Sequence, residues 1–221
     1  RNNFNAKLSN YHLSWIISNL TAMFEIRPAL ESDCQSMLDI YTPSIHNKAT
    51  SFEFEVPTHE QFLLRVSNIQ NHFPWLVCTK DSHLTGYAYA GPHRGRKAYQ
   101  WTAELSGYID PKFHRLGIAR ALYTALIEIL KLQGYFTVLA GISLPNQNSV
   151  SFHESLGFTP IGVYQNIGYK FSRWHSVGWW QYAVSDYPTH ASAPQKAHII
   201  INSPAGKEIL HRAVEMIKTN S

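Results

Sequence analysis

A carboxylate followed by a glycine-containing turn is the part of this 221-residue chain best suited to chemistry. Glu104 lies in a run rich in aromatic and β-branched residues, 101–110, which predicts a strand that Asp110-Pro111 would end. From Gly117 onward, apolar residues recur with the period of a helix. At such a strand-to-helix turn, free backbone N–H groups and the positive end of the helix dipole can bind an anion such as pyrophosphate. Residues 114–119 are therefore the predicted anion site, to which Arg115 adds a positive charge.

Each of these features also has a purely structural interpretation. An arginine shortly before a glycine begins many ordinary helices, and a glutamate in a strand can face solvent or pair with a cation. Apolar surroundings, however, raise the pKa of a carboxyl toward the range in which it can act as a general base near neutral pH. Glu104 is therefore a candidate base with two open alternatives.

The elements that must position these residues alternate along the chain. Predicted strands outnumber helices, and local connections are mixed with crossovers, which indicates an α+β fold around one central twisted sheet. The predicted strands are residues 24–28, 75–79, 84–90, 101–110, 135–142, 159–166 and 178–184, with 51–56 as a further extended piece. The predicted helices follow Ser32 or Asp33 (apolar stripe Met37, Leu38, Tyr41, Ile45), Thr58 (Phe62, Leu63, Val66, Ile69) and Gly117, with a short one at 148–156.

Composition excludes several classes of function. The net charge of +4 sits in the terminal segments, because basic and acidic residues balance between 24 and 187, so no basic face for nucleic acid is expected. No apolar run approaches the ~20 residues of a membrane span. The histidines lack the spacing of metal ligands. Cys34 and Cys78 are predicted to be core residues without a disulfide, which suits a reducing, cytoplasmic compartment.

Two terminal segments stand apart from the predicted domain, residues 23–187. Residues 1–22 are expected to be a loosely ordered extension, and a signal peptide is disfavoured because 15–20 is interrupted by Asn19, so the Asn19-Leu20-Thr21 sequon carries no meaning. Residues 188–221 are expected to be a linker and an amphipathic helix capped by Ser203-Pro204. An added dimer contact is the hypothesis for that helix.

A second motif carries a family resemblance. Residues 144–158, with Asn146, His153 and Gly157-Phe158, resemble the second half of the acyl-CoA pocket of the GCN5-related N-acetyltransferase (GNAT) superfamily, with His153 where many members have a tyrosine. Further segments resemble the phosphinothricin and methionine-sulfone N-acetyltransferases. These are Phe73-Pro74-Trp75-Leu76-Val77, Tyr87-Ala88-Tyr89-Ala90-Gly91-Pro92, Trp101-Thr102-Ala103-Glu104 and Trp174-His175-Ser176-Val177-Gly178-Trp179-Trp180.

The resemblance implies a fold, a reaction and a cofactor. The fold would be the GNAT fold, a twisted, mixed, mostly antiparallel sheet splayed at the acyl-CoA site and flanked by about four helices. Acetyl-CoA would be the co-substrate, with no metal, and the α-amine of a small amino acid analogue would attack it directly in a ternary complex. The partners implied are a small amine and a second copy of the chain, with no nucleic acid and no membrane.

The resemblance also assigns roles to single residues. Glu104 would be the catalytic base, acting directly or through a water, and His153 a general acid to the thiol or a second base. Asn146 would bind pantetheine, with helix capping as the compatible alternative. The acceptor would meet Arg96, Phe52, Tyr89 and Trp101, of which the aromatic residues could equally be core. The complete cofactor set is Gly107, Tyr108, Ile109, His114, Arg115, Leu116, Gly117, Ile118, Ala119, Asn146 and Ser149.

Two other functions remain open. The same chemistry could act on a polyamine, an antibiotic or a protein N-terminus, which the cation Arg96 disfavours. A non-catalytic acyl-CoA sensor is the second alternative, and the presence of both Glu104 and His153 argues against it. Leu105, Ser106 and Ser176 depart from the family pattern, so the acceptor is less defined than the cofactor.

Overall fold

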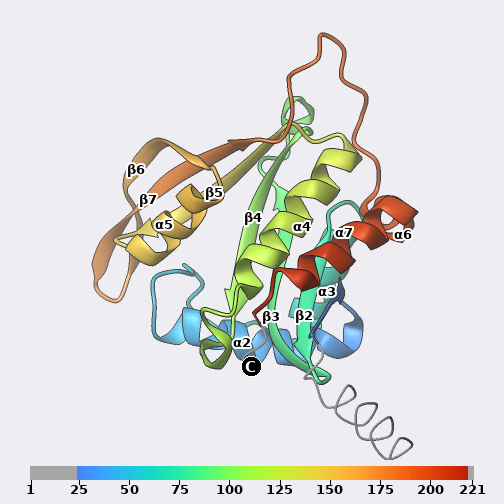
Figure 1. The fold of residues 1–221 in the computed structure, drawn as a ribbon. Coiled ribbons are helices and arrows are strands. Elements are labelled where there is room, and N and C mark those ends of the chain that lie inside the picture. The colour runs from blue at the N-terminus through green and yellow to red at the C-terminus, as the bar shows by residue number, and fades with distance from the viewer. Residues whose placement is uncertain (1–23, 219–221) are drawn as a thin grey trace, which may run out of the picture.

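A seven-stranded sheet forms the centre of the computed structural model, which describes residues 24–218 (Figure 1). The strands are β1 (Phe24–Pro28), β2 (Trp75–Lys80), β3 (His83–Pro92), β4 (Thr102–Ile109), β5 (Thr137–Leu144), β6 (Thr159–Lys170) and β7 (Arg173–Ala183). Their order in the sheet is β1-β2-β3-β4-β5-β7-β6, and every neighbouring pair is antiparallel except β4 and β5. The predicted mixed, mostly antiparallel sheet is thereby confirmed.

The parallel pair β4 and β5 separates soon after it forms. Its register covers only Thr102 with Thr137, Ala103 with Val138, and Glu104 with Leu139. Beyond Glu104, β4 continues to Ile109 paired with β3, while β5 continues to Leu144 paired with β7. The edge of β4 that faces β5 therefore carries unpaired backbone groups from Leu105 onward, and the splay predicted from the family resemblance is present.

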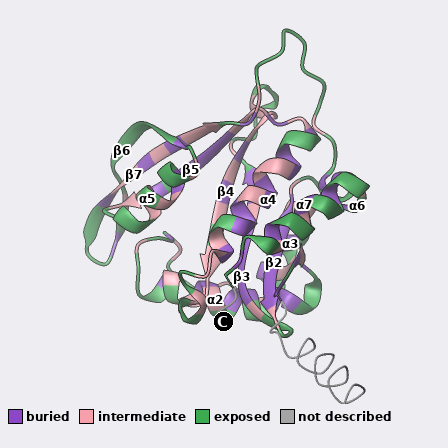
Figure 2. Ribbon diagram, in the orientation of Figure 1, coloured by how far each residue is buried: buried purple, intermediate pink, exposed green. Residues whose placement is uncertain are grey.

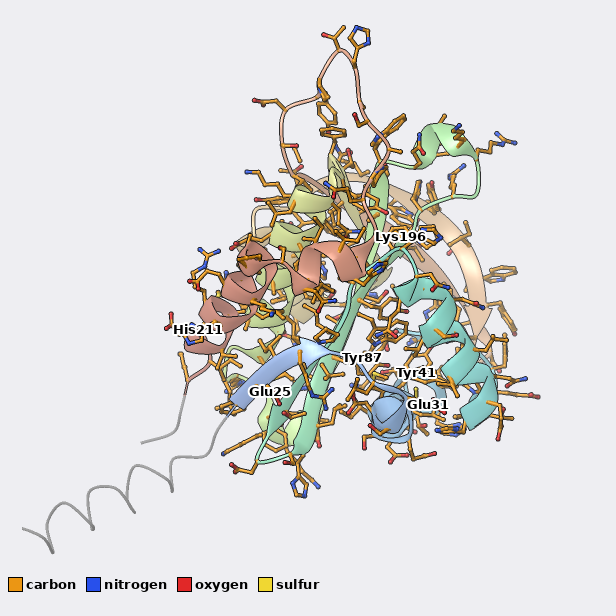
Figure 3. The ribbon with its side chains drawn as sticks, turned by 90° about the vertical axis from the view of Figure 1, so that its right-hand side faces the viewer. Glu25, Glu31, Tyr41, Tyr87, Lys196 and His211 are labelled. Atoms are coloured by element: carbon orange, nitrogen blue, oxygen red, sulfur yellow. The ribbon has the colours of Figure 1, made fainter. Side chains whose placement is uncertain are left out.

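Helices cover both faces of the sheet. On one face lie α4 (Ile118–Gln133) and α5 (Gln147–Ser155), and on the other lie α2 (Cys34–His46) and α3 (His59–Gln70). The predicted apolar stripes of α2, α3 and α4 belong to the two buried clusters that result. Figure 2 marks the buried residues along the helices and strands. In Figure 3, Tyr41 of α2 and Tyr87 of β3 mark the second cluster, and the Tyr108 ring contacts both of theirs.

The C-terminal segment packs on its own chain. The helices α6 (Ala197–Asn202) and α7 (Pro204–Glu215) lie beside α4 and β1. Ser203 caps α7 as predicted, accepting a hydrogen bond from the Gly206 N–H, and Ile209, Ala213 and Ile217 are buried in the cluster under α4. The apolar face of this helix therefore supplies part of the core of its own chain, and a dimer contact through the rest of the helix stays a prediction.

Several boundaries differ from those predicted. Residues 51–56 form no strand, because Ser51 is held by side-chain hydrogen bonds and Phe54 turns outward. The last two strands are longer than predicted and meet at the turn Phe171-Ser172, where positive φ angles of 51° and 59° reverse the chain. The proposed extension, residues 1–22, and the sequon at Asn19 lie outside the described residues. No helix within 24–218 is long and apolar enough to cross a membrane.

Candidate active site

A continuous groove follows the opening between β4 and β5. Its central cavity, about 310 Å³, is lined by the free edge of β4 from Leu105 to Ile109, by β5 and by the start of α5. A cavity of about 380 Å³ adjoins one end and shares Leu105, Ser106 and Gly141 with it. A third cavity, about 780 Å³, adjoins the other end through Gly107, Ile109 and His114. We call these the central, acceptor and nucleotide cavities.

Glu104 lies at the last paired position of β4, and its side chain lines the acceptor cavity. The side chain is 32% exposed, so its burial is partial rather than deep. Its Oε1 accepts a short hydrogen bond from Nδ1 of His93, which follows β3 directly. The antiparallel register places Gly91 opposite Glu104 and so brings His93 to it from 11 positions away in the sequence. The groove thus carries a carboxylate held from one side and open on the other.

The nucleotide cavity is built around the turn before α4. Gly117 has a φ of 89°, a left-handed conformation that suits glycine, and the first backbone hydrogen bond of the helix runs from Ala121 N–H to the Gly117 carbonyl. The N–H groups of Ile118, Ala119 and Arg120 have no acceptor within the helix. Arg115, at the same turn, lines this cavity as well. This is the arrangement of backbone donors and positive charge that holds a pyrophosphate.

His153 is buried on α5, with 5% of its surface exposed, and lines the central cavity. Its Nδ1 donates to the Ser149 carbonyl at 2.7 Å. The ring contacts Tyr123, Phe152 and Phe158 edge-on. Burial lowers the pKa of His153, against the opposing effect of the Ser149 hydrogen bond. At neutral pH the ring is therefore neutral, and its Nε2 is a buried acceptor without a partner among the described residues.

Both apolar and polar side chains line the acceptor cavity. Phe52 and Thr50 line it from the loop after α2, and the hairpin of β6 and β7 supplies Trp179 among others. Gly168 of β6 permits the close approach of that loop, because a Cβ there would lie 2.5 Å from the Phe52 ring. Glu104 is the only charged lining residue among those that the structure describes. The cavity can therefore place a small amine beside the Glu104 carboxylate.

Comparison with known proteins decides the family. Residues 26–179 match the model of the "Acetyltransferase (GNAT) domain". The chain belongs to the GNAT acetyltransferase family.

Solved GNAT structures share this fold. A phosphinothricin acetyltransferase from Sinorhizobium meliloti, crystallised with acetyl-CoA, superposes with a TM-score of 0.72 at 28% identity, covering 80% of this chain and 99% of that one. A putative acetyltransferase, yncA, from Salmonella typhimurium, also with acetyl-CoA, gives 0.71 at 29%, covering 77% and 97%. Both hold the cofactor implied for this GNAT domain.

Curated relatives are similar over most of their length. A phosphinothricin N-acetyltransferase from Streptomyces viridochromogenes is 40% identical over 157 residues, 71% of this chain and 86% of the relative. An L-methionine sulfoximine/L-methionine sulfone acetyltransferase from Salmonella typhimurium is 29% identical, over 73% and 95%. The predicted resemblance to the phosphinothricin and methionine-sulfone N-acetyltransferases is thereby confirmed.

The groove gathers most of the residues selected from the sequence. Of the cofactor set, all but Leu116 line the central or the nucleotide cavity. Leu116 contributes its carbonyl to the Lys218 N–H at 2.8 Å. Asn146 lines the central cavity and also caps α5, accepting from the Ser149 N–H, so its two predicted roles are compatible.

Three of the four residues predicted to bind the acceptor do not line the acceptor cavity. Tyr89 stacks on Trp75 at 3.9 Å in the cluster under α2 and α3, because the strand alternation turns its side chain to that face of the sheet. Trp101 precedes β4 and donates its indole N–H to the Ser192 carbonyl at 2.7 Å. Arg96 is exposed in the loop after β3, outside the lining of the acceptor cavity. Of the four predicted acceptor residues, only Phe52 lines it.

Two residues that support the groove were not predicted from the sequence. The bond from His93 to Glu104 depends on the register of β3 on β4. Lys170 was not singled out, yet its buried ammonium holds the loop that carries Phe52. A histidine eleven residues before the candidate base was the only signal for the first. Among residues 24–218, no three or more His, Cys, Asp or Glu are grouped to hold a metal ion.

Proposed function

We propose that this chain is an acetyl-CoA-dependent N-acetyltransferase that acts on the α-amino group of a small amino acid analogue, of the phosphinothricin, methionine sulfone or methionine sulfoximine type. The observation that carries the proposal is the position of Glu104, where the splayed strands open and the acceptor and central cavities adjoin. Relatives named for these acceptors support the substrate class.

Several features of the groove fit acetyl-CoA. The free edge of β4 offers backbone hydrogen-bonding groups to the amides of a pantetheine arm, and Gly117 and the first turn of α4 offer N–H groups to a pyrophosphate. Acetyl-CoA supplies the acetyl group as a thioester, which the amine nitrogen attacks while coenzyme A leaves as the thiol. An N–H of the β4 edge near Gly107 or Tyr108 can stabilise charge on the carbonyl oxygen, an effect of about 3 kcal/mol for a single donor.

Glu104 removes the proton that the amine must lose. Alkyl ammonium groups with a pKa near ~10 are almost fully protonated at neutral pH, so a base is required before or during attack. The oxygen of Glu104 that does not bind His93 accepts this proton, directly or through one water. The neutral ring of His153 carries its proton on Nδ1 and has none on Nε2 to give. We therefore favour the role of a second base for this nitrogen over that of a general acid.

A homodimer in the cytoplasm completes the proposal. The edge strand β6 exposes Ile161, Val163, Ile167 and Tyr169, at 54%, 45%, 56% and 51% of their surfaces. A long, unpaired, apolar edge is a surface that a second copy of the chain would cover. Cys34 and Cys78 are free and buried, which fits a reducing compartment.

The proposal is tested by measuring thiol release from acetyl-CoA with purified protein and a panel of amines. The panel holds phosphinothricin, methionine sulfone, methionine sulfoximine, common amino acids, spermidine and an N-terminal peptide. Turnover with the first three and acetylation at the α-nitrogen by mass spectrometry are expected. Activity confined to spermidine or to the peptide would replace the acceptor class, and tight acetyl-CoA binding without turnover would favour a sensor.

A further inference from the structure

The pair of His93 and Glu104 lies where the proposed reaction needs a base. Nδ1 of His93 donates to Oε1 of Glu104, and the two side chains are 14% and 32% exposed. A carboxylate accepts through either oxygen, so a bond to Oε1 leaves Oε2 toward the cavity that Glu104 lines. Without that bond, a glutamate one-third exposed would be free to turn into solvent.

The surroundings of His93 hold its ring in place. Tyr99 contacts the ring edge-on at 5.7 Å, and Trp179 does so at 5.9 Å. Trp179 also lines the acceptor cavity, so one aromatic side chain contacts both the histidine and the acceptor space. The Arg94 guanidinium lies over the Tyr99 ring, at 5.7 Å from its centroid. Among the described residues, Glu104 is the only charged group that pairs with His93.

We infer that His93 is the positioning residue of the base: its Nδ1–H fixes Glu104 so that the second carboxylate oxygen faces the amine. This rests on the proposed function and deepens it. In the step concerned, one proton moves from the amine nitrogen to Oε2 of Glu104, and His93 keeps its own proton on Nδ1 throughout. The charge of the imidazole is not needed for this role, because a neutral ring with Nδ1–H also donates.

Two substitutions separate a donor from a merely space-filling side chain. His93→Asn places an amide N–H close to the position of Nδ1, whereas His93→Leu fills the space without a donor. We expect His93→Leu to lower kcat about tenfold, which corresponds to one lost hydrogen bond, with the KM for acetyl-CoA unchanged. His93→Asn should recover most of kcat. His198→Leu, at an exposed histidine of α6, is the matched control.

A second measurement does not depend on turnover. Long-range ¹H–¹⁵N spectra report which ring nitrogen of His93 carries the proton, and we expect Nδ1–H in the wild type and a shift toward Nε2–H in Glu104→Leu. Wild-type kcat in His93→Leu, equal loss in His93→Leu and His93→Asn, or Nε2–H in the wild type would each overturn the inference. If no amine is acetylated by the wild type, the proposed function fails, and the spectra still decide whether His93 donates to Glu104.

Discussion

The ammonium nitrogen of Lys170 lies 2.7 Å from the carbonyl oxygen of Ser51, and both residues are buried. The same ammonium donates to the carbonyls of Ile45 at 2.7 Å and Lys48 at 3.4 Å, at the C-terminal end of α2 where the helix dipole is negative. One cation at the end of β6 therefore ties down the loop that carries Thr50 and Phe52 into the acceptor cavity.

Lys170→Met keeps the length of the side chain and removes its charge. At least two buried carbonyls would lose their donor, so we expect a loss of about 1–3 kcal/mol in the free energy of unfolding. The freed loop should raise the KM for the acceptor while the affinity for acetyl-CoA stays unchanged. Lys196→Met, at an exposed lysine (Figure 3), is the control. Denaturant unfolding and steady-state kinetics measure both effects; an unchanged acceptor KM would show that the loop keeps its place without the lysine.

Glu104→Gln removes the candidate base and keeps its shape. We expect kcat to fall about 10²–10⁴-fold, the usual contribution of a general base, and the dissociation constant of acetyl-CoA to stay the same. Glu31→Gln, at an exposed acid before α2, should have wild-type kinetics. Single-turnover measurements separate chemistry from product release, and a variant that retains wild-type turnover would end the assignment.

His153 makes stability depend on pH. Burial lowers the pKa of His153, so the unfolded chain binds a proton at a higher pH than the folded chain does. The free energy of unfolding should therefore fall as pH drops below about 6.5, by at most about 1.4 kcal/mol per pH unit from this group. In His153→Gln this contribution disappears, whereas in His198→Gln it persists. Urea unfolding between pH 5 and pH 8 provides the comparison, and parallel curves for His153→Gln and the wild type would contradict the expectation.

Gly117→Ala introduces a side chain at a left-handed position of the anion turn. The φ of 89° costs a non-glycine residue about 1–2 kcal/mol, and the new Cβ would lie 3.0 Å from the Met216 carbonyl oxygen. Lower thermal stability and weaker binding of coenzyme A are both expected, by calorimetry. Gly95→Ala meets no atom within 4 Å and should leave stability unchanged, so equal losses in the two variants would argue against a strained turn.

Ile161→Asp tests the apolar edge of β6. If a second copy of the chain covers this strand, one buried aspartate on each side should dissociate the dimer, because an unpaired charge is expensive to bury. Multi-angle light scattering should then give a dimer for the wild type and for Leu64→Asp, which alters an equally exposed residue of α3, and a monomer for Ile161→Asp. A monomeric wild type would contradict the dimer, and a dimeric Ile161→Asp would show that the interface does not include this strand.

The sequence by itself determined the elements whose signals are local. The apolar period of α4, the cap and proline of α7 and the apolar runs of β2 and β3 are set by residues within a few positions of one another, and the structure has these elements where they were predicted. The anion turn at Gly117 is local in the same sense, since its backbone donors belong to one helix end. Where local signals were weak, as in residues 51–56, side-chain hydrogen bonds from distant residues prevailed over the alternation.

The tertiary structure alone decided which side chains meet. The register of β3 on β4 brings His93 to Glu104, and the length of the β6–β7 hairpin brings Lys170 under the loop of Phe52; both depend on pairings between segments far apart in the chain. The packing of α2 and α3 on one face of the sheet likewise places Tyr89 in the core rather than in the acceptor cavity. Strand type is encoded by neighbouring residues, but register is fixed by the fit of whole faces against helices, so contacts across strands could not be read from spacing.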